Sequence, residues 1–250
     1  MFLKLIFCTV IAMKATLSYC QDIKSKDHLQ QGWLGYFNQS RFSGKWGLWL
    51  DLHLRTREDF VKDLSQSIAR VGLTYYISDA TKLTAGYAYV IHYPADNHKS
   101  VSLPEQRGWQ QIQWHTKYGK QRMMQWIRLE EKFKRKVLND STLARGHSFN
   151  YKLRYNLWYE IPFTKKGVVP NSFSLVANDE VHINFGKEIV NNYFDQNRFF
   201  IGIKYQVNQH DNFQAGYMYV FQQLAAGDKY KIINAIRLFY FHNLDFRKKI

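Results

Sequence analysis

The sequence predicts an all-β fold, an antiparallel up-and-down transmembrane β-barrel, on three observations. Apolar and polar residues alternate with a period of two in many segments, as they do in strands with one apolar face. Several of these segments have ten residues or more, which is enough to cross a bilayer when the strand is tilted. Aromatic residues gather near the ends of the apolar faces, where membrane barrels have aromatic girdles.

The composition excludes two other classes of protein. Of 250 residues, 46% are hydrophobic and 17% are aromatic, a content too high for a disordered chain. The mean hydropathy is −0.44, and no run after the N-terminus approaches the ~18 consecutive apolar residues of a membrane-spanning helix. A polytopic helical membrane protein is therefore excluded.

The first expected element is a secretory signal peptide over residues 1–20. A short basic start precedes an apolar run that is too short to span a bilayer. Cleavage between Cys20 and Gln21 leaves a single β-barrel domain over 21–250, and a lipoprotein signal with a lipidated Cys20 is the alternative. The other cysteine, Cys8, also lies in this segment, so the exported domain is predicted to have no disulfide.

The positive charge of the chain raises the question of its partners. Loss of Lys4 and Lys14 with the signal peptide lowers the formal charge from +15 to +13. A basic, aromatic-rich chain suggests nucleic acid at first, but export argues against that partner. The expected location is the outer membrane, and the expected partners are outer-membrane lipid and lipopolysaccharide, with a small anionic solute as a further possibility.

Two segments show the alternation best. Residues 45–55 place four leucines and Trp46 on one face, and residues 149–161 place Phe, Tyr, Leu and Ile at every second position. A helix would scatter these side chains around its surface. Nine further candidate strands follow the pattern, some of them weakly: 31–39, 68–77, 82–93, 105–116, 122–133, 172–185, 199–207, 213–221 and 230–246.

The candidate strands depart from the expected pattern in two ways. Glu131 and Asp179 fall on the apolar faces of their segments, and we expect a β-bulge to shift the register there. The count of eleven is odd, whereas single-chain bacterial barrels have an even number of strands. We therefore predict twelve strands rather than ten, with the missing strand in 22–30 or in the long final segment.

The connections between the candidate strands alternate in length. Short turns are expected near 40–44, 78–81, 118–121 and 208–211, and longer loops near 56–66, 94–103, 134–146, 186–196 and 223–228. Short turns on one side and long loops on the other are typical of outer-membrane barrels.

One segment repeats. Residues 71–90 align without gaps on 201–220, and seven positions are identical, among them glycines at 72/202 and 86/216. Each copy is expected to be one hairpin with a short turn. Gly86 and Gly216 lie on the polar face, where a missing side chain makes room for bulky neighbours in a narrow lumen. The repeat favours two hairpins with the same packing over a duplicated half-barrel.

Three features favour a barrel whose apolar face contacts lipid and whose polar face lines the lumen: strand length, aromatic girdles and strand number. A soluble barrel with its apolar face inside is the alternative. Cross-strand charges of alternating sign are then expected to pair in the lumen. The predicted charge ladder consists of Arg128, Glu130, Arg154, Glu180 and Arg198. Further lumen candidates are Asp51, His53, Arg55, Arg70, Arg107, Lys152, Glu160, His182 and Lys204.

The same segments resemble an uncharacterised family of outer-membrane β-barrels common in Bacteroidota. The motifs, in order, are 127–133 (IRLEEKF), 153–155 (LRY), Glu180 with Asn184, and 195–198 (DQNR) followed by Gly202; Trp33, Lys45-Trp46 and the closing segment 235–246 add to them. The resemblance covers most of 30–246, and it implies the fold and the location but no activity.

The sequence shows no catalytic, cofactor or metal motif. No His-x-x-x-His or His-Glu-x-x-His spacing occurs, and His147-Ser148 places the two side chains on opposite faces of a strand. The predicted function is a small passive channel or structural barrel with a basic lumen that favours anions, and not an enzyme. The alternatives are a membrane-embedded lipid-modifying enzyme and a soluble periplasmic ligand-binding barrel.

Overall fold

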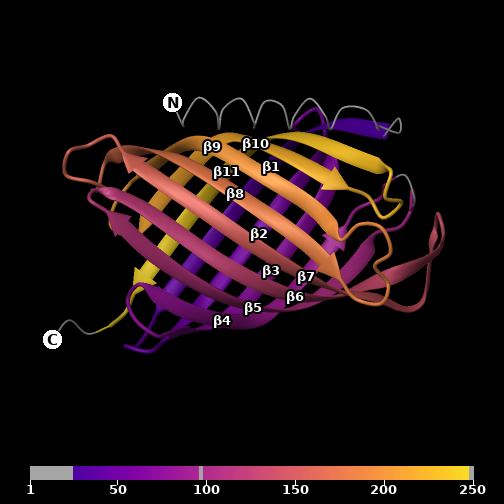
Figure 1. The fold of residues 1–250 in the computed structure, drawn as a ribbon, viewed down its shortest axis with the longest axis horizontal. Coiled ribbons are helices and arrows are strands. Elements are labelled where there is room, and N and C mark those ends of the chain that lie inside the picture. Colours follow the sequence, from indigo (N-terminus) through magenta and orange to yellow (C-terminus); the bar gives the residue numbers. More distant parts are fainter. Residues whose placement is uncertain (1–24, 96–97, 248–250) are drawn as a thin grey trace, which may run out of the picture.

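The computed structural model describes residues 25–95 and 98–247, and these residues form a closed barrel of eleven strands (Figure 1). The predicted signal peptide and its cleavage point lie outside the described residues. None of the described residues forms a helix that is long and apolar enough to cross a membrane. The strands are β1 Ser25–Arg41, β2 Trp46–Glu58, β3 Lys62–Tyr76, β4 Thr81–His92, β5 Leu103–Tyr118, β6 Gln121–Asn139, β7 Thr142–Pro162, β8 Ser172–Phe185, β9 Phe194–Gln206, β10 Asp211–Gln223 and β11 Lys229–Asp245.

Each strand pairs antiparallel with the next, and β1 pairs with β11 to close the barrel. This last pair is parallel, with Ser25 opposite Lys229 and Arg41 opposite Asp245. The described chain therefore begins at one end of the barrel and finishes at the other (Figure 1). We call these the N-terminal end, where β1 begins, and the C-terminal end, where β11 finishes.

The prediction of twelve strands is wrong for the described residues. Neither place suggested for the missing strand contains one, because residues from Ser25 to 30 lengthen β1 and the final segment is the single strand β11. An even number is needed only when every neighbouring pair is antiparallel. The parallel pair β1–β11 removes that requirement.

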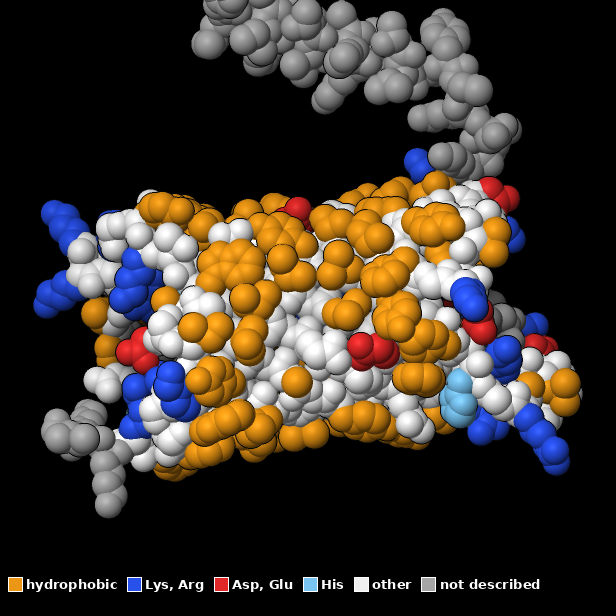
Figure 2. Space-filling model, turned by 60° about the horizontal axis from the view of Figure 1, so that its bottom comes forward, with side chains coloured by type: hydrophobic (Ala, Val, Ile, Leu, Met, Phe, Trp, Pro, Cys, Tyr) orange, Lys and Arg blue, Asp and Glu red, His pale blue; other side chains and the backbone are white. Residues whose placement is uncertain are grey.

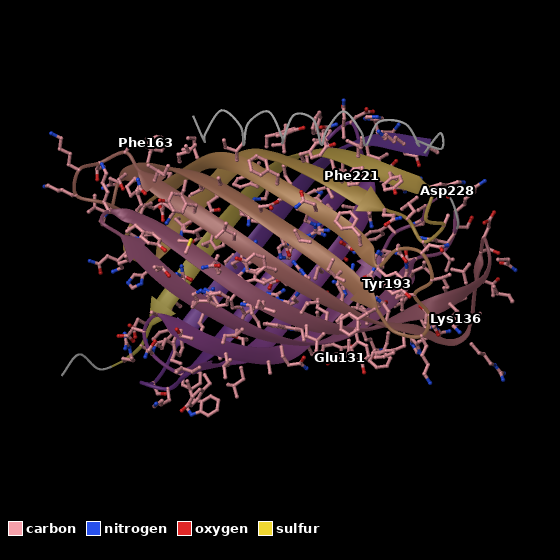
Figure 3. The ribbon with its side chains drawn as sticks, in the orientation of Figure 1. Glu131, Lys136, Phe163, Tyr193, Phe221 and Asp228 are labelled. Carbon is pink, nitrogen blue, oxygen red and sulfur yellow. The ribbon has the colours of Figure 1, made fainter. Side chains whose placement is uncertain are left out.

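The predicted alternation of short turns and long loops is only partly correct. Most of 56–66 and 134–146 belongs to strands rather than to loops. β2 and β3 are joined by a short turn in which Asp59 and Phe60 have positive φ (48° and 62°). β6 and β7 continue to a tight turn after Asn139. The connection 163–171, which the sequence did not mark, is one of the longer ones and lies at the opposite end. Figure 3 shows Phe163 there, and Lys136 and Asp228 at the N-terminal end.

The outer wall of the barrel is apolar. Leu48, Leu52 and Leu54 of β2 are 42–46% exposed, whereas Asp51, between them on the other face, is fully buried. Figure 2 shows hydrophobic side chains over the middle of the wall and Lys and Arg side chains gathered at both ends. The alternation in the sequence thus becomes an apolar exterior and a charged interior, as predicted.

The bulges expected at Glu131 and Asp179 do not occur at these residues. The register is unbroken through both residues, so the two carboxylates lie on the outer wall. Neighbouring amides bind them, since Gln110 Nε2 lies 3.3 Å from Glu131 Oε2 and Asn197 Nδ2 lies 2.7 Å from Asp179 Oδ1. A local hydrogen bond therefore replaces the register shift.

The repeated hairpins β3–β4 and β9–β10 each place two glycines side by side. Gly72 pairs with Gly86, and Gly202 pairs with Gly216. A Cβ on Gly86 would lie 2.1 Å from the carbonyl oxygen of Val71, so no side chain fits there. The space inside is filled by bulky neighbours, Trp109 beside the first pair and Phe200 beside the second.

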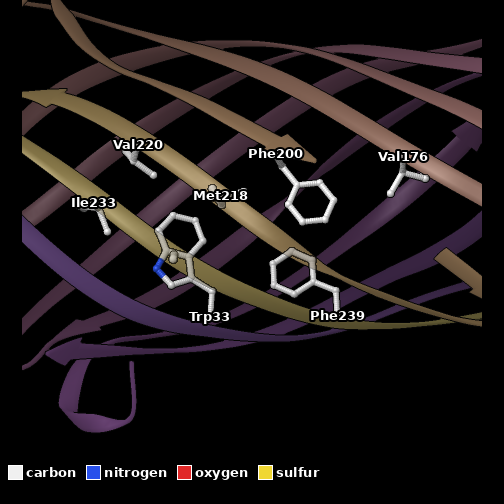
Figure 4. Packing of buried hydrophobic residues seen from close by; sticks show 8 residues of the cluster. Trp33, Val176, Phe200, Met218, Val220, Ile233 and Phe239 are labelled. Carbon is white, nitrogen blue, oxygen red and sulfur yellow. The ribbon is translucent and has the colours of Figure 1, made fainter. Parts of the chain in front are cut away.

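Apolar side chains also pack inside the barrel, mainly on the β8–β11 side. Figure 4 shows Trp33 of β1, Phe200 of β9, Met218 of β10 and Phe239 of β11 among the members of this cluster. A smaller cluster joins Trp49, Ala88 and Trp109. The interior thus combines aromatic rings with charges, and this combination defines the candidate site.

Candidate functional site

The centre of the predicted charge ladder is a chain of ion pairs across β6, β7 and β8. Arg154 Nη1 lies 2.6 Å from Glu130 Oε1, and Arg154 Nε donates to Glu180 Oε1 at 2.7 Å. The outer members lie farther away, since Arg128 and Arg198 are each 3.9 Å from their carboxylates. The structure therefore brings together Glu130, Arg154 and Glu180, with the other two arginines at the edge.

A second buried cluster surrounds Asp51 of β2. Arg70 Nη1 lies 2.8 Å from Asp51 Oδ1, and Trp49 Nε1 donates to Oδ2 at 2.6 Å. His53 Nε2 lies 2.9 Å from the same carboxylate. Three of the predicted lumen residues, Asp51, His53 and Arg70, thus meet in one group, as required for a fully buried carboxylate.

Further predicted lumen residues form ion pairs towards the two ends. Arg107 binds Glu105 and lies 3.2 Å from Glu130. Near the C-terminal end, Lys204 Nζ lies 3.0 Å from Glu160 Oε1. Every predicted acid of the lumen therefore has at least one cationic neighbour.

Sequence reasoning missed one buried carboxylate, Asp195. It accepts a hydrogen bond from Lys152 Nζ at 2.6 Å and lies 3.8 Å from His182 Nδ1. Strict alternation from Arg198 places Asp195 on the outer wall, but the β8–β9 register shifts between His182 and Ile183 and turns it inward. The alternation in the sequence contains no signal for this bulge.

Cations outnumber carboxylates in the interior. Among the described residues, eight buried Lys and Arg side chains stand against six buried Asp and Glu side chains. Arg55, Lys82 and Arg237 have no carboxylate oxygen within 4.0 Å in the part of the chain that the structure describes. Their partners are amides and rings, such as Gln66 for Arg55 and Gln214 for Arg237.

The tryptophans of the interior stack against arginines. The guanidinium carbon of Arg128 lies 4.5 Å from the ring centroid of Trp109 and 4.9 Å from that of Trp126. Arg128 also donates to Gln111 Oε1 at 2.8 Å. Cation–π contacts of this kind stabilise a desolvated arginine without neutralising it, so the charge of Arg128 stays largely available to the lumen.

Two cavities occupy the lumen. The N-side cavity has a volume of about 430 Å³, and its wall contains Arg57, Arg107, Lys132 and Lys152. The C-side cavity has a volume of about 370 Å³ and is lined by aromatic rings as well as cations. Both volumes fall in or near the range of about 300–1,000 Å³ typical of small-ligand sites.

Five side chains line both cavities and therefore lie between them: Trp33, Arg55, Arg70, Arg154 and Arg198. We call this group the waist. Within it, the guanidinium carbons of Arg55 and Arg198 lie 3.8 Å and 5.1 Å from the ring centroid of Trp33. Asp51, Glu130 and Glu180 bind the other two arginines, so ion pairs and ring contacts hold the side chains of the waist between the two cavities.

The C-terminal mouth of the barrel is held by exposed ion pairs. Arg41 Nη1 lies 2.5 Å from Asp79 Oδ1, and Arg247 Nη2 lies 2.6 Å from Asp245 Oδ2. The hydrogen bond and positive charge of Arg41 lower the pKa of Asp79 below its ordinary value. These pairs frame an open depression that shares Gln39 with the C-side cavity.

The site contains few groups for metal or nucleophilic chemistry. Within 25–95 and 98–247, no three His, Cys, Asp or Glu side chains are grouped as a metal site would require. His182 Nε2 lies 2.9 Å from Glu180 Oε1, which brings together two possible ligands. The Ser148 hydroxyl donates to the Lys134 carbonyl at 3.3 Å, and His147 beside it is exposed. The arrangement is suited to binding anions.

Residues 30–231 match the family described as a protein of unknown function (DUF2490). The chain belongs to this family. The match spans β2 to β10 and most of β1, so it includes the ladder and the waist. No match was found among curated proteins or among solved structures. Membership in DUF2490 agrees with the sequence motifs and gives no activity.

Proposed function

We propose that this chain is a transmembrane β-barrel of the outer membrane whose basic lumen admits small anions but is closed at the waist. The observation that carries the proposal is the distribution of side chains, apolar on the outer wall and ionic inside (Figure 2). A soluble barrel would have the reverse distribution, because its apolar face would fill the interior.

The outer wall supports the membrane part of the proposal. Exposed apolar side chains occur on all eleven strands of the described chain, whereas soluble monomers rarely expose continuous apolar patches above a few hundred Å². Aromatic pairs lie at both ends, Phe133–Phe149 towards the N-terminal end and Phe173–Tyr205 towards the C-terminal end. This is the arrangement expected of interfacial girdles.

The membrane location is testable by gel migration and export. We expect the refolded chain to require detergent or lipid and to migrate faster in gels before heating than after it, as compact barrels do. We also expect the mature protein from the outer-membrane fraction to begin at Gln21 by mass spectrometry. A chain that stays soluble without detergent, or whose migration does not change on heating, contradicts the membrane barrel.

Planar-bilayer recording tests whether the waist closes the lumen. We expect no steady conductance from the native chain and an anion-selective current from the double variant Arg55→Ala, Arg198→Ala, because these two side chains cover Trp33 between the cavities. The control Arg145→Ala, Lys187→Ala removes two exposed cations and is expected to remain closed. A native current equal to that of the double variant contradicts closure, and a cation-selective current contradicts the anion preference.

A further inference from the structure

The wall of the C-side cavity is rich in aromatic side chains. Rings from five strands face it, and several belong to different apolar clusters. Aromatic side chains in its lining include Phe37, Trp49, Trp126, Trp158, Phe239 and Phe241. Such rings offer flat apolar surfaces to a ligand body, whereas the wall of the N-side cavity is dominated by charged and polar groups.

Two buried cations that line the same cavity have no carboxylate partner among the described residues. Lys82 of β4 is 7% exposed; its amine donates to Gln39 and lies 5.6 Å from the ring centroid of Trp49. Arg237 of β11 is 5% exposed and donates through Nη2 to Gln214 at 3.2 Å. Its Nε has no hydrogen-bond partner among the described residues. Both positions therefore hold donors in excess.

Burying such cations is costly. A desolvated charge without a counter-ion destabilises a fold by several kcal/mol unless other groups compensate. Here the compensation comes from rings, since the guanidinium carbon of Arg237 lies 3.3 Å from the ring centroid of Phe200 and 4.5 Å from that of Phe239. An anionic ligand would supply the missing counter-ion, and a carboxylate matches the donor fork of a guanidinium.

The cavity is reachable from the C-terminal mouth. Gln39 and Asn243 line both the C-side cavity and the depression framed by the mouth ion pairs. The waist lies between this cavity and the N-side cavity. The mouth therefore gives a ligand a route to the C-side cavity.

We propose that the C-side cavity binds an organic carboxylate with one negative charge and a ring-bearing apolar body. Arg237 binds the carboxylate, and the aromatic rings of the cavity contact the body. Lys82, which reaches Gln39 nearer the mouth, adds positive charge along the path of the ligand. The inference rests on the proposed function only in that the chain must fold as a barrel with its polar face inside.

Isothermal titration of the refolded full chain in detergent with 2-naphthoate tests this assignment. We expect saturable binding of 2-naphthoate and none of acetate or 2-naphthamide, which lack the body and the charge respectively. Arg237→Gln should weaken binding about tenfold or more, and Lys82→Gln should weaken it less, because Lys82 lies nearer the mouth. The matched controls Arg145→Gln and Lys45→Gln remove the same charges from exposed positions and should bind as the native chain does.

Both glutamine variants are expected to fold, because each removes a buried cation that has no carboxylate partner. Their heat-modifiable migration checks this, and their melting temperatures should equal or exceed that of the native chain. Equal binding by the cavity variants and the controls, or equal binding of the neutral amide, would overturn the inference. A closed, heat-modifiable barrel that binds no naphthoate overturns the binding inference and leaves the proposed function intact. An open native pore that binds naphthoate through Arg237 overturns the proposed closure and leaves the binding inference intact.

Discussion

Glu130 and Glu131 are adjacent in β6 but have opposite surroundings. Glu130 is 1% exposed and lies between Arg154 and Arg107 at 2.6 Å and 3.2 Å. Glu131 lies on the outer wall, where Gln110 is the amide beside it, and Figure 3 labels it at the edge of the barrel. Substitutions at these two residues therefore compare the effect of a charge in the lumen with that of a charge on the outer wall.

Glutamine at each position should show this difference. Glu130→Gln leaves two buried arginines short of a carboxylate, so we expect the free energy of unfolding to fall by about 3–5 kcal/mol. Glu131→Gln keeps the hydrogen-bonding shape and removes a charge from an apolar wall, so we expect little change or a small gain. Urea unfolding in liposomes, followed by tryptophan fluorescence, measures both. Equal losses would contradict the buried ladder.

Alternation in the sequence predicted which face each charged residue occupies for most of the lumen, because side chains in a strand alternate strictly. It correctly predicts that Asp51, Glu130, Arg154 and Glu180 lie inside. It missed Asp195, since a bulge shifts its register. It also gave no partners, because a pair such as Arg154 with Glu180 depends on strand register and side-chain reach, which alternation does not encode.

At the scale of the element, the hairpin β3–β4 depends on the paired glycines Gly72 and Gly86. Trp109 occupies the space that their missing side chains leave. The sequence repeat predicted this hairpin and its counterpart β9–β10 because both glycines recur at the same spacing. The ends of β2, β6 and β7 were predicted less well, since polar strand extensions beyond the apolar belt have the composition of loops.

Valine in place of Gly86 should prevent correct pairing of the hairpin. Its Cβ would lie 2.1 Å from the Val71 carbonyl oxygen and 2.6 Å from the Gly72 Cα, both backbone atoms. We expect a loss of at least about 3 kcal/mol or failure to refold, read as loss of the heat-modifiable band. Ala85→Val, one residue away on the outer wall, is the control and should refold as the native chain does.

At the scale of the whole molecule, closure depends on one parallel pair among antiparallel neighbours. Parity reasoning from bacterial barrels failed here because it assumes that the first and last strands also run antiparallel. The period-two pattern does predict the eleven strand segments, since each has its own apolar face. Periodicity does not predict which two strands pair to close the barrel.

A disulfide tests the parallel closure. In a chain with Cys8→Ser and Cys20→Ser, the pair Ser40→Cys and Leu244→Cys should oxidise readily, since these residues are register partners of β1 and β11 and neighbouring strands are about 5 Å apart. The pair Asn38→Cys and Asp211→Cys flanks His242 from opposite sides of β11 and should stay reduced. Mass spectrometry under non-reducing conditions distinguishes them. A twelfth strand between β1 and β11 would keep the first pair reduced.

The parallel seam also fixes the polarity of the molecule. Ser25 and Asp245 sit at opposite ends of the barrel, so a tag placed before β1 and a tag placed after β11 would face different compartments if the barrel spans a bilayer. A protease added to one side would then remove one tag and spare the other. By the same geometry, joining the two ends to make a circular permutant would require a linker as long as the barrel.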